Sequence, residues 1–242
     1  MRIDKLLANM GYGTRKEVKS LLKGGTVHVN ESPVKNGKTH VDPEEDVVTV
    51  AGEKVEYRRF IYLMMNKPGD LISATEDQNE WTVVDILQPE DKVFSPFPVG
   101  RLDKDTEGLL LLTNDGQLSH RLTSPKKGVG KTYVAEVAGE VTGDDADAFE
   151  RGVTLDDGYV TRPANLHIIE SGDISHVELV ITEGKFHQVK RMFEARGKKV
   201  TRLKRVKMGE LVLDEELEPG EYRELRENEI EYLHTITSKD KG

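Results

Sequence analysis

Residues 100–116 read GRLDKDTEGLLLLTNDG. The first half is a polar loop that carries Asp103, and the second half contains the apolar run Leu109–Leu112, which ends at the turn signal Asn114-Asp115-Gly116. A short apolar run bounded by turn residues predicts a buried strand. The segment therefore places a carboxylate in a loop just before a core strand, where by residue type alone it is most often a turn or salt-bridge residue.

The regions around this segment mix strands with helices. The run Ile61–Met65 predicts a buried strand that stops at residues 66–69, and residues 131–137 and 177–181 alternate as half-buried strands do. A helix is predicted to open at Gly184 and to end at Gly197. Elements mixed in this way, without a repeating strand–helix rhythm, argue for an α+β fold.

The helix predicted between Gly184 and Gly197 carries its apolar residues at helical spacing. Phe186, Val189 and Phe193 form one stripe, and Lys190 lies off it. Lys190 can therefore point outward into a cleft, although an ordinary surface lysine of a basic helix would look the same.

The N-terminal region has a pattern of its own. Residues 3–10 carry an apolar stripe at helical spacing. Thr14 followed by Glu17 is a capping-box pattern that starts a second helix, which Gly24-Gly25 ends. Valine-rich stretches between residues 27 and 50 predict short strands.

Length and composition favour two domains. The chain has 242 residues, of which 36% are hydrophobic, which is long for one domain. Residues 51–61 look like a polar linker, so we predict domains at residues 1–57 and 58–242.

Several classes of protein are disfavoured. The chain has no cysteine, which excludes disulfides, thiolate catalysis and cysteine-bound metal and fits a reducing compartment. No apolar run approaches the roughly 18 residues of a membrane span, and the N-terminus lacks the apolar core of a signal peptide. We expect a cytoplasmic protein with no membrane association.

Charge is distributed unevenly. The formal net charge is −9, yet residues 184–207 hold ten basic side chains against one acid, Glu194. Such a stretch can attract a polyanion to one face of an acidic protein. A second group of cations lies on the solvent-facing side of the helix that Thr14 is predicted to cap. This group forms either a solvated face or a phosphate-contacting one. Its members are Arg15, Lys16, Lys19 and Lys23.

Two partial motifs are decoys. Residues 125–132 nearly match a phosphate-binding P-loop, but Pro125 replaces its first glycine, and the sequence that follows alternates like a strand where the motif needs a helix. Residues 103–114 resemble a calcium loop but end in Asn114 instead of glutamate. No histidine–carboxylate spacing suggests a catalytic metal.

Three segments in order resemble the pseudouridine synthases of the Rsu/Rlu superfamily. Residues 100–116 resemble the active-site motif, Lys131-Thr132-Tyr133 the strand with the active-site tyrosine, and residues 183–192 the motif that supplies a cation. Residues 1 to about 50 resemble the S4-like RNA-binding domain that precedes the catalytic domain in much of this family. The resemblance implies a small S4-like α/β domain followed by a catalytic domain with a large, mainly antiparallel mixed sheet.

The resemblance also assigns roles to individual residues. Asp103 becomes the essential carboxylate, Lys190 the cation that keeps it ionised, and Tyr133 the aromatic that stacks on the target base. Without the family, Tyr133 would be read as a core aromatic. The implied substrate-binding residues are Arg101, Ile181 and Gln188. Arg101 could instead pair with a local acid, and Ile181 could be plain core. The implied RNA-binding residues are Arg15, Lys16, Lys19, Lys23, Lys185 and Arg191.

The reaction implied is isomerisation of uridine to pseudouridine in ribosomal RNA. It involves no redox change and no leaving fragment, so we expect no cofactor, no nucleotide and no metal. Overall resemblance favours uridine 516 of 16S rRNA, free or in a small-subunit assembly intermediate, as the target of a monomeric enzyme. The alternatives are a 23S rRNA target, a non-catalytic RNA-binding or ribosome-assembly factor for which Asp103 is dispensable, and an NTP-dependent enzyme that binds nucleotide.

Overall fold

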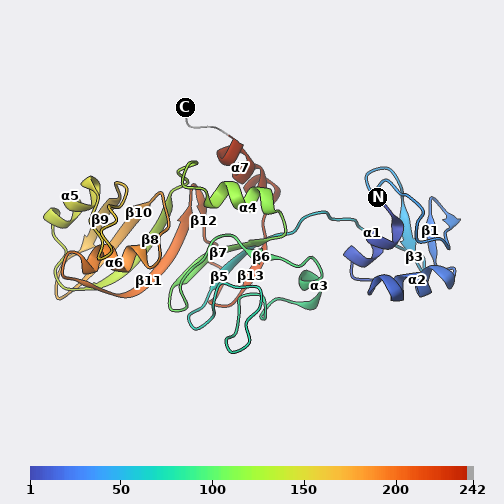
Figure 1. The fold of residues 1–242 in the computed structure, drawn as a ribbon, viewed down its shortest axis with the longest axis horizontal. Helices are drawn as coiled ribbons and strands as arrows, with labels where there is room; N and C mark the ends of the chain where they lie inside the picture. The colour runs from blue at the N-terminus through green and yellow to red at the C-terminus, as the bar shows by residue number, and fades with distance from the viewer. Residues whose placement is uncertain (239–242) are drawn as a thin grey trace. The chain divides into compact units, whose positions relative to one another are not determined.

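The computed structural model describes residues 1–238, which divide into two compact units (Figure 1). One unit comprises Met1–Ile61 and the segment Leu87–Ser95, and the other comprises Tyr62–Ile86 and the chain from Pro96 onward. No signal in the sequence indicates that Leu87–Ser95 belongs with the first unit. Within residues 1–238, no helix has the length and apolar character that crossing a membrane requires.

The first unit is a small α/β structure whose antiparallel sheet has the order β2-β1-β3-β4. Helix α2 begins as the sequence predicts. Thr14 is its N-cap, and the Glu17 carboxylate accepts a hydrogen bond from the Thr14 backbone N–H at 2.7 Å. The predicted linker is wrong in its first part, because β4 pairs with β3 and Val55 is buried in the core. The elements are α1 (Ile3–Asn9), α2 (Arg15–Lys23), β1 (Val27–Val29), β2 (Ser32–Pro33), β3 (Val48–Val50), β4 (Glu53–Lys54) and α3 (Pro89–Lys92).

The second unit is built on a nine-stranded mixed sheet with the order β13-β5-β7-β11-β8-β10-β9, which confirms the predicted sheet type. Strand β6 pairs with β7, and β12 pairs with β11. The strands are β5 (Tyr62–Lys67), β6 (Phe97–Pro98), β7 (Glu107–Thr113), β8 (Lys131–Ala138), β9 (Asn165–Glu170), β10 (Ile174–Ile181), β11 (Lys199–Met208), β12 (Leu211–Val212) and β13 (Tyr222–Glu224). The helices are α4 (Gly116–Thr123), α5 (Gly143–Arg151), α6 (Gln188–Glu194) and α7 (Glu227–Ser238).

The centre of this sheet is the parallel pair β7 and β11, in which Gly108 faces Arg205. Gly108 has a φ of +100°, and a Cβ there would lie 2.2 Å from the Arg205 carbonyl oxygen. Only glycine fits such a close approach. The apolar run Leu109–Leu112 is fully buried in β7, as predicted.

Helices cover the two halves of the sheet separately. In Figure 1, α4 and α7 lie together beside the β5–β7 half, while α5 and α6 lie with the β8–β11 half. Leu118 and Leu122 of α4 and Leu233 of α7 share a core with Leu109 and Leu111 of β7.

Two sequence predictions in this unit are wrong in detail. Strand β5 continues through Lys67 instead of stopping before it. Helix α6 begins only at Gln188, so Phe186 is not on its apolar stripe and is 73% exposed. The cause is His187, whose φ of +48° is a left-handed conformation outside the helix.

Candidate active site

The loop between β6 and β7 places Asp103 in a cleft of about 800 Å³. Volumes of roughly 300–1,000 Å³ are usual for small-molecule sites, so the cleft can take a nucleoside. Its other walls come from the segment 72–77, from β8 and from residues 184–189. The three segments that the sequence analysis singled out therefore meet at one site within the second unit.

Two side chains hold the Asp103 loop. The Ser73 hydroxyl donates to the Leu102 carbonyl at 2.9 Å and accepts from the Leu102 N–H at 3.0 Å. From the other side, the buried Lys67 ammonium donates to the carbonyls of Pro68, Lys104 and Thr106 at 2.9, 3.1 and 2.9 Å. These bonds fix the backbone on both sides of Asp103.

Burial lowers the pKa of Lys67 to about 8, against the opposing pull of nearby carboxylates including Asp105 and Asp103. The group still carries its proton at neutral pH, and three N–H donors match three carbonyl acceptors.

Two basic side chains flank the Asp103 carboxylate. Lys190 Nζ lies 3.3 Å from Asp103 Oδ2, and His187 Nε2 lies 3.5 Å from Asp103 Oδ1. Lys190 is nearer to Asp105, at 2.6 Å, and this hydrogen bond lowers the pKa of the Asp105 carboxyl. The structure thus brings Lys190 to Asp103 as predicted, but shares its charge with a second, exposed carboxylate.

The floor of the cleft is one face of the sheet. Tyr133 is 7% exposed and lies directly opposite Arg205 across β8 and β11. Ile181 lies opposite Lys131 across β10 and β8. Paired residues of an antiparallel ladder point to the same face, so the four side chains form a single surface beneath the cleft.

The other two predicted substrate-binding residues, Arg101 and Gln188, differ in whether their side chains are already held by other groups. Arg101 is exposed at the cleft and, within residues 1–238, makes no ion pair, which leaves its guanidinium available. Gln188 is buried, and its amide donates to Glu183 at 2.9 Å and accepts from the Lys185 N–H at 2.9 Å. Gln188 therefore shapes the loop 183–188 and is not free to bind a ligand.

An aromatic pair stands at the rim of the cleft. The rings of Phe186 and His187 are stacked, with centroids 3.8 Å apart and an angle of 17° between their planes. Close by, Lys185 Nζ lies 4.5 Å from the centre of the Tyr159 ring. Flat, exposed aromatic faces beside a cation suit the bases of single-stranded RNA.

The basic stretch 184–207 is largely neutralised in the folded protein. Six of its ten cations form ion pairs with acids from other parts of the second unit or, for Lys207, from nearby in the chain. These six are Lys190, Arg191, Arg196, Lys198, Arg202 and Lys207. The predicted RNA-binding residue Arg191 is held by Asp156 and Asp157, and only 14% of its side chain is exposed.

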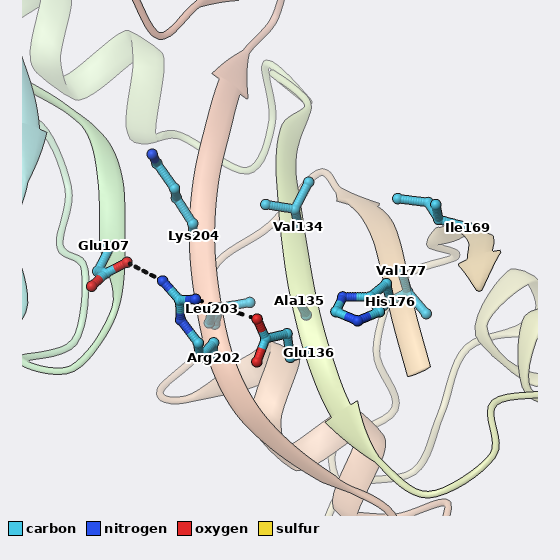
Figure 2. A pocket seen from close by; sticks show the side chains of 10 residues that line it. All are labelled: Glu107, Val134, Ala135, Glu136, Ile169, His176, Val177, Arg202, Leu203 and Lys204. Atoms are coloured by element: carbon cyan, nitrogen blue, oxygen red, sulfur yellow. Dashed lines mark hydrogen bonds and ion pairs between the residues drawn. The ribbon is translucent and has the colours of Figure 1, made fainter. Parts of the chain in front are cut away.

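Figure 2 shows one of these pairings, beside Val134 and Glu136 of β8. These two residues alternate with Tyr133 along the strand and so lie on the other face of the sheet. A hollow of about 200 Å³ there is lined by side chains of β7 to β11, and Arg202 bridges Glu107 and Glu136 across it at 3.7 and 3.3 Å. Since Arg202 is matched by two carboxylates, this hollow offers no free positive charge from that residue.

The cations of α2 behave differently. All four are exposed, and none forms an ion pair within the described residues. The one acid on this helix, Glu17, is engaged in the capping box. The four are the predicted residues Arg15, Lys16, Lys19 and Lys23.

Comparison with known proteins gives this geometry a family. Residues 61–195 match the family model for RNA pseudouridylate synthase, and residues 1–48 match that of the S4 domain. The chain belongs to the RNA pseudouridylate synthase family. Its enzymatic activity is thus the conversion of uridine to pseudouridine in RNA, and its first unit is an S4 domain.

Individual pseudouridine synthases resemble the chain along nearly its whole length. An uncharacterized RNA pseudouridine synthase, YtzG, of Bacillus subtilis is 56% identical, covering 97% of this chain and 98% of that protein. A ribosomal small subunit pseudouridine synthase A of Vibrio cholerae is 43% identical, covering 95% and 98%. A crystal structure of a pseudouridylate synthase matches with a TM-score of 0.68 at 38% identity, covering 96% and 99%.

The sequence analysis gave no role to three residues that line the pseudouridylate synthase cleft, or to the buried lysine that holds its Asp103 loop. They are Lys67, Lys131, His187 and Arg205. Lys67 was read as part of the turn that ends a strand, and Lys131 and His187 lay inside recognised motifs. Arg205 was one of ten cations in a basic run. Only the charge at the end of an apolar strand, at Lys67, could have marked a buried lysine beforehand.

Proposed function

We propose that this enzyme isomerises one uridine of 16S rRNA, uridine 516 in particular, with Asp103 as its essential carboxylate. The observation that carries the proposal is the grouping of Asp103, Lys190 and Tyr133 around one nucleoside-sized cleft. The small-subunit target is supported by the 43% identical relative from Vibrio cholerae, whose name assigns it to the small ribosomal subunit.

Each group has a defined part in the chemistry. Asp103 attacks C1′ of the ribose or removes the C2′ proton, and the Lys190 ammonium, 3.3 Å from Asp103 Oδ2, holds the carboxylate in place for either role. Tyr133 presents a ring for the target base to stack on. The base must leave its helical stack to enter, at a cost of a few kcal/mol.

RNA contacts outside the cleft offset that cost. We assign backbone contacts to the four free cations of α2 and to Lys185, and base stacking to the Phe186–His187 pair. Arg191 is omitted because Asp156 and Asp157 already neutralise it. Arg101 stands free at the cleft to contact a phosphate or to fill the space of the displaced base. We propose that the enzyme acts as a monomer.

The test is release of tritium from 16S and 23S transcripts labelled at uracil C5, with wild type compared with Asp103→Asn. We expect release from 16S only and none from the variant, because the amide cannot act as nucleophile or base. Release from 23S alone would keep the enzyme but overturn the target. Release by Asp103→Asn would remove the carboxylate from the mechanism, and no release even from small-subunit assembly particles would favour a binding factor.

A further inference from the structure

Two cations on the cleft floor have no carboxylate partner among residues 1–238. Arg205 is 1% exposed, and within the described residues its guanidinium makes a single hydrogen bond, from Nε to the Leu109 carbonyl at 2.8 Å. Its Nη2 is buried without an acceptor in that part of the chain. Lys131, also at the cleft, reaches only the Val129 carbonyl, at 3.5 Å, among the residues that the structure describes.

The acid that acts on Lys131 is already engaged elsewhere. Glu183 accepts hydrogen bonds from the Tyr159 hydroxyl at 2.6 Å, the Arg162 N–H at 2.8 Å and the Gln188 amide at 2.9 Å. The cleft floor therefore carries an excess of positive charge that residues 1–238 do not neutralise. Burying an unpaired charge is costly, and such groups persist where a ligand or a reaction requires them.

These cations flank the residue on which the target base is expected to stack. Arg205 is the direct cross-strand partner of Tyr133, and Lys131 precedes Tyr133 by two residues on the same strand face. A second unpartnered donor, the buried Thr106 hydroxyl, lines the same cleft. A ring lying on Tyr133 is thus bordered by Lys131 and by two donors, Arg205 Nη2 and the Thr106 hydroxyl, that have no acceptor within the described residues.

We propose that Arg205 and Lys131 bind the uracil after it is detached from the ribose and stabilise its negative charge. The inference rests on the proposed function. The carbonyl oxygens of the detached ring are the acceptors that the two cations and Thr106 lack. Preorganised cations where charge develops stabilise a transition state more than they stabilise the neutral substrate.

The charge arises on either route open to Asp103. When the C1′–N1 bond breaks, its electron pair leaves with N1, while C1′ gains a bond to an Asp103 oxygen or, after loss of the C2′ proton to Asp103, a double bond to C2′. The uracil is an anion in both cases. After the uracil turns, C5 bonds to C1′. On the first route the ester bond to Asp103 breaks; on the second, Asp103 returns its proton to C2′ as the double bond is lost. The C5 proton then goes to water and N1 takes a proton, so atoms and electrons balance.

The main test compares Lys131→Met with Lys131→Arg in single-turnover tritium release at saturating RNA. We expect about a 100-fold slower rate for methionine, in line with the loss of one preorganised donor, and recovery to within about tenfold of wild type for arginine. RNA affinity should stay within about threefold in both. Lys204→Met is the matched control, since Lys204 lies on the opposite face of β11 beside the hollow of Figure 2.

A second substrate separates charge stabilisation from a structural role. 5-Fluorouridine at the target position gives a more acidic base whose anion needs less help, and its rearrangement can be followed by chromatography after nuclease digestion. The rate loss of Lys131→Met should then shrink to about tenfold or less. Arg205→Lys should likewise lose less rate on 5-fluorouridine than on uridine. This variant keeps a positive charge near Leu109, so it is less prone to misfold than one that removes the charge.

The pH profile supplies a third readout. Burial and the neighbouring Arg205 charge lower the pKa of Lys131 to about 8, with Glu183 opposing. The wild-type rate should fall as pH rises through about 8, as Lys131 loses its proton. Lys131→Arg should reduce that fall to the part left by Lys67, whose pKa burial also lowers to about 8.

Three results would overturn the inference. The first is a single-turnover rate for Lys131→Met that equals that of an active wild type. The second is an equal loss of rate for Lys131→Met on uridine and on 5-fluorouridine. The third is a Lys131→Met variant that loses RNA affinity but no rate at saturating RNA, which would mark a phosphate-binding site. An inactive wild type would instead count against the proposed function.

Discussion

The two basic segments of the chain differ in what their charges touch. The cations of α2 are exposed and unpaired within the described residues, whereas six of the ten in residues 184–207 are matched by carboxylates. In sequence, both are runs of lysine and arginine, and the second run is the denser.

The difference indicates a division of labour. Unpaired surface cations attract RNA phosphates and release counterions, so they govern affinity and its salt dependence. Paired cations have little field left to attract RNA, but they position acids and loops. Lys190 next to Asp103 is the case that matters most for catalysis.

The largest effect should come from Lys190→Met. Without the ammonium, Asp103 loses the ion pair that holds its carboxylate at the reacting position, and we expect the single-turnover rate to fall by about 1,000-fold while RNA affinity changes less than about threefold. The matched variant Lys19→Met, with the same side-chain change on α2, should do the reverse. Comparable rate losses in the two variants would break the division between the segments.

A large loss of stability should follow from removing two paired cations, in Arg196→Gln/Lys198→Gln. Both contact Asp145, whose side chain is fully buried, at 2.9 Å. An uncompensated buried carboxylate should lower the free energy of unfolding by about 3 kcal/mol, measured by urea denaturation. Adding Asp145→Asn should recover part of it. If stability held and RNA affinity dropped instead, these cations would belong with those of α2.

Replacing Arg15, Lys16, Lys19 and Lys23 by glutamine should act on RNA affinity alone. We expect the dissociation constant to be 10- to 100-fold larger near physiological salt. The slope of log affinity against log salt concentration should decrease in magnitude by about three, because each phosphate contact contributes roughly 0.7 to 0.9 to it. The rate at saturating RNA should not change.

The control for that variant tests bulk charge. Lys19→Gln/Lys23→Gln is compared with Lys35→Gln/Lys38→Gln, which removes the same charge from exposed positions of the same unit. Equal losses in the two pairs would mean that net charge, and not the face of α2, attracts the RNA.

The sequence predicted the fold and the main site well where local pattern decides the outcome. The Thr14–Glu17 cap and the buried run Leu109–Leu112 were both correct because each follows from neighbouring residues alone. Asp103, Tyr133 and Lys190 were found through motifs, and the structure brings them to one cleft.

What the sequence could not predict depends on contacts between distant residues. Lys67 is buried because two carbonyls of the Asp103 loop, those of Lys104 and Thr106, accept its hydrogen bonds, and Arg191 is neutralised by acids over 30 positions away. The helix stripe failed at Phe186 because one residue, His187, adopts a left-handed conformation that periodicity does not reveal.

Phe186 therefore provides the smallest and most specific test of the basic segment. If residues 184–207 add to affinity mainly through this ring, Phe186→Ala should weaken RNA binding by about tenfold, within the range of one base-stacking contact, and leave its salt dependence unchanged. Ile169→Ala, at another exposed apolar residue, is the control and should have no effect.

Fluorescence can observe the same contact directly. The chain has one tryptophan, Trp81, so Trp81→Phe/Phe186→Trp carries a single reporter at the rim of the cleft. Stacking on an RNA base should quench it, with a midpoint that matches the dissociation constant. Unquenched emission together with normal affinity for Phe186→Ala would mean that the aromatic pair only shapes the loop around His187. Affinity would then rest on the cations of α2, which would make the division between the two segments sharper.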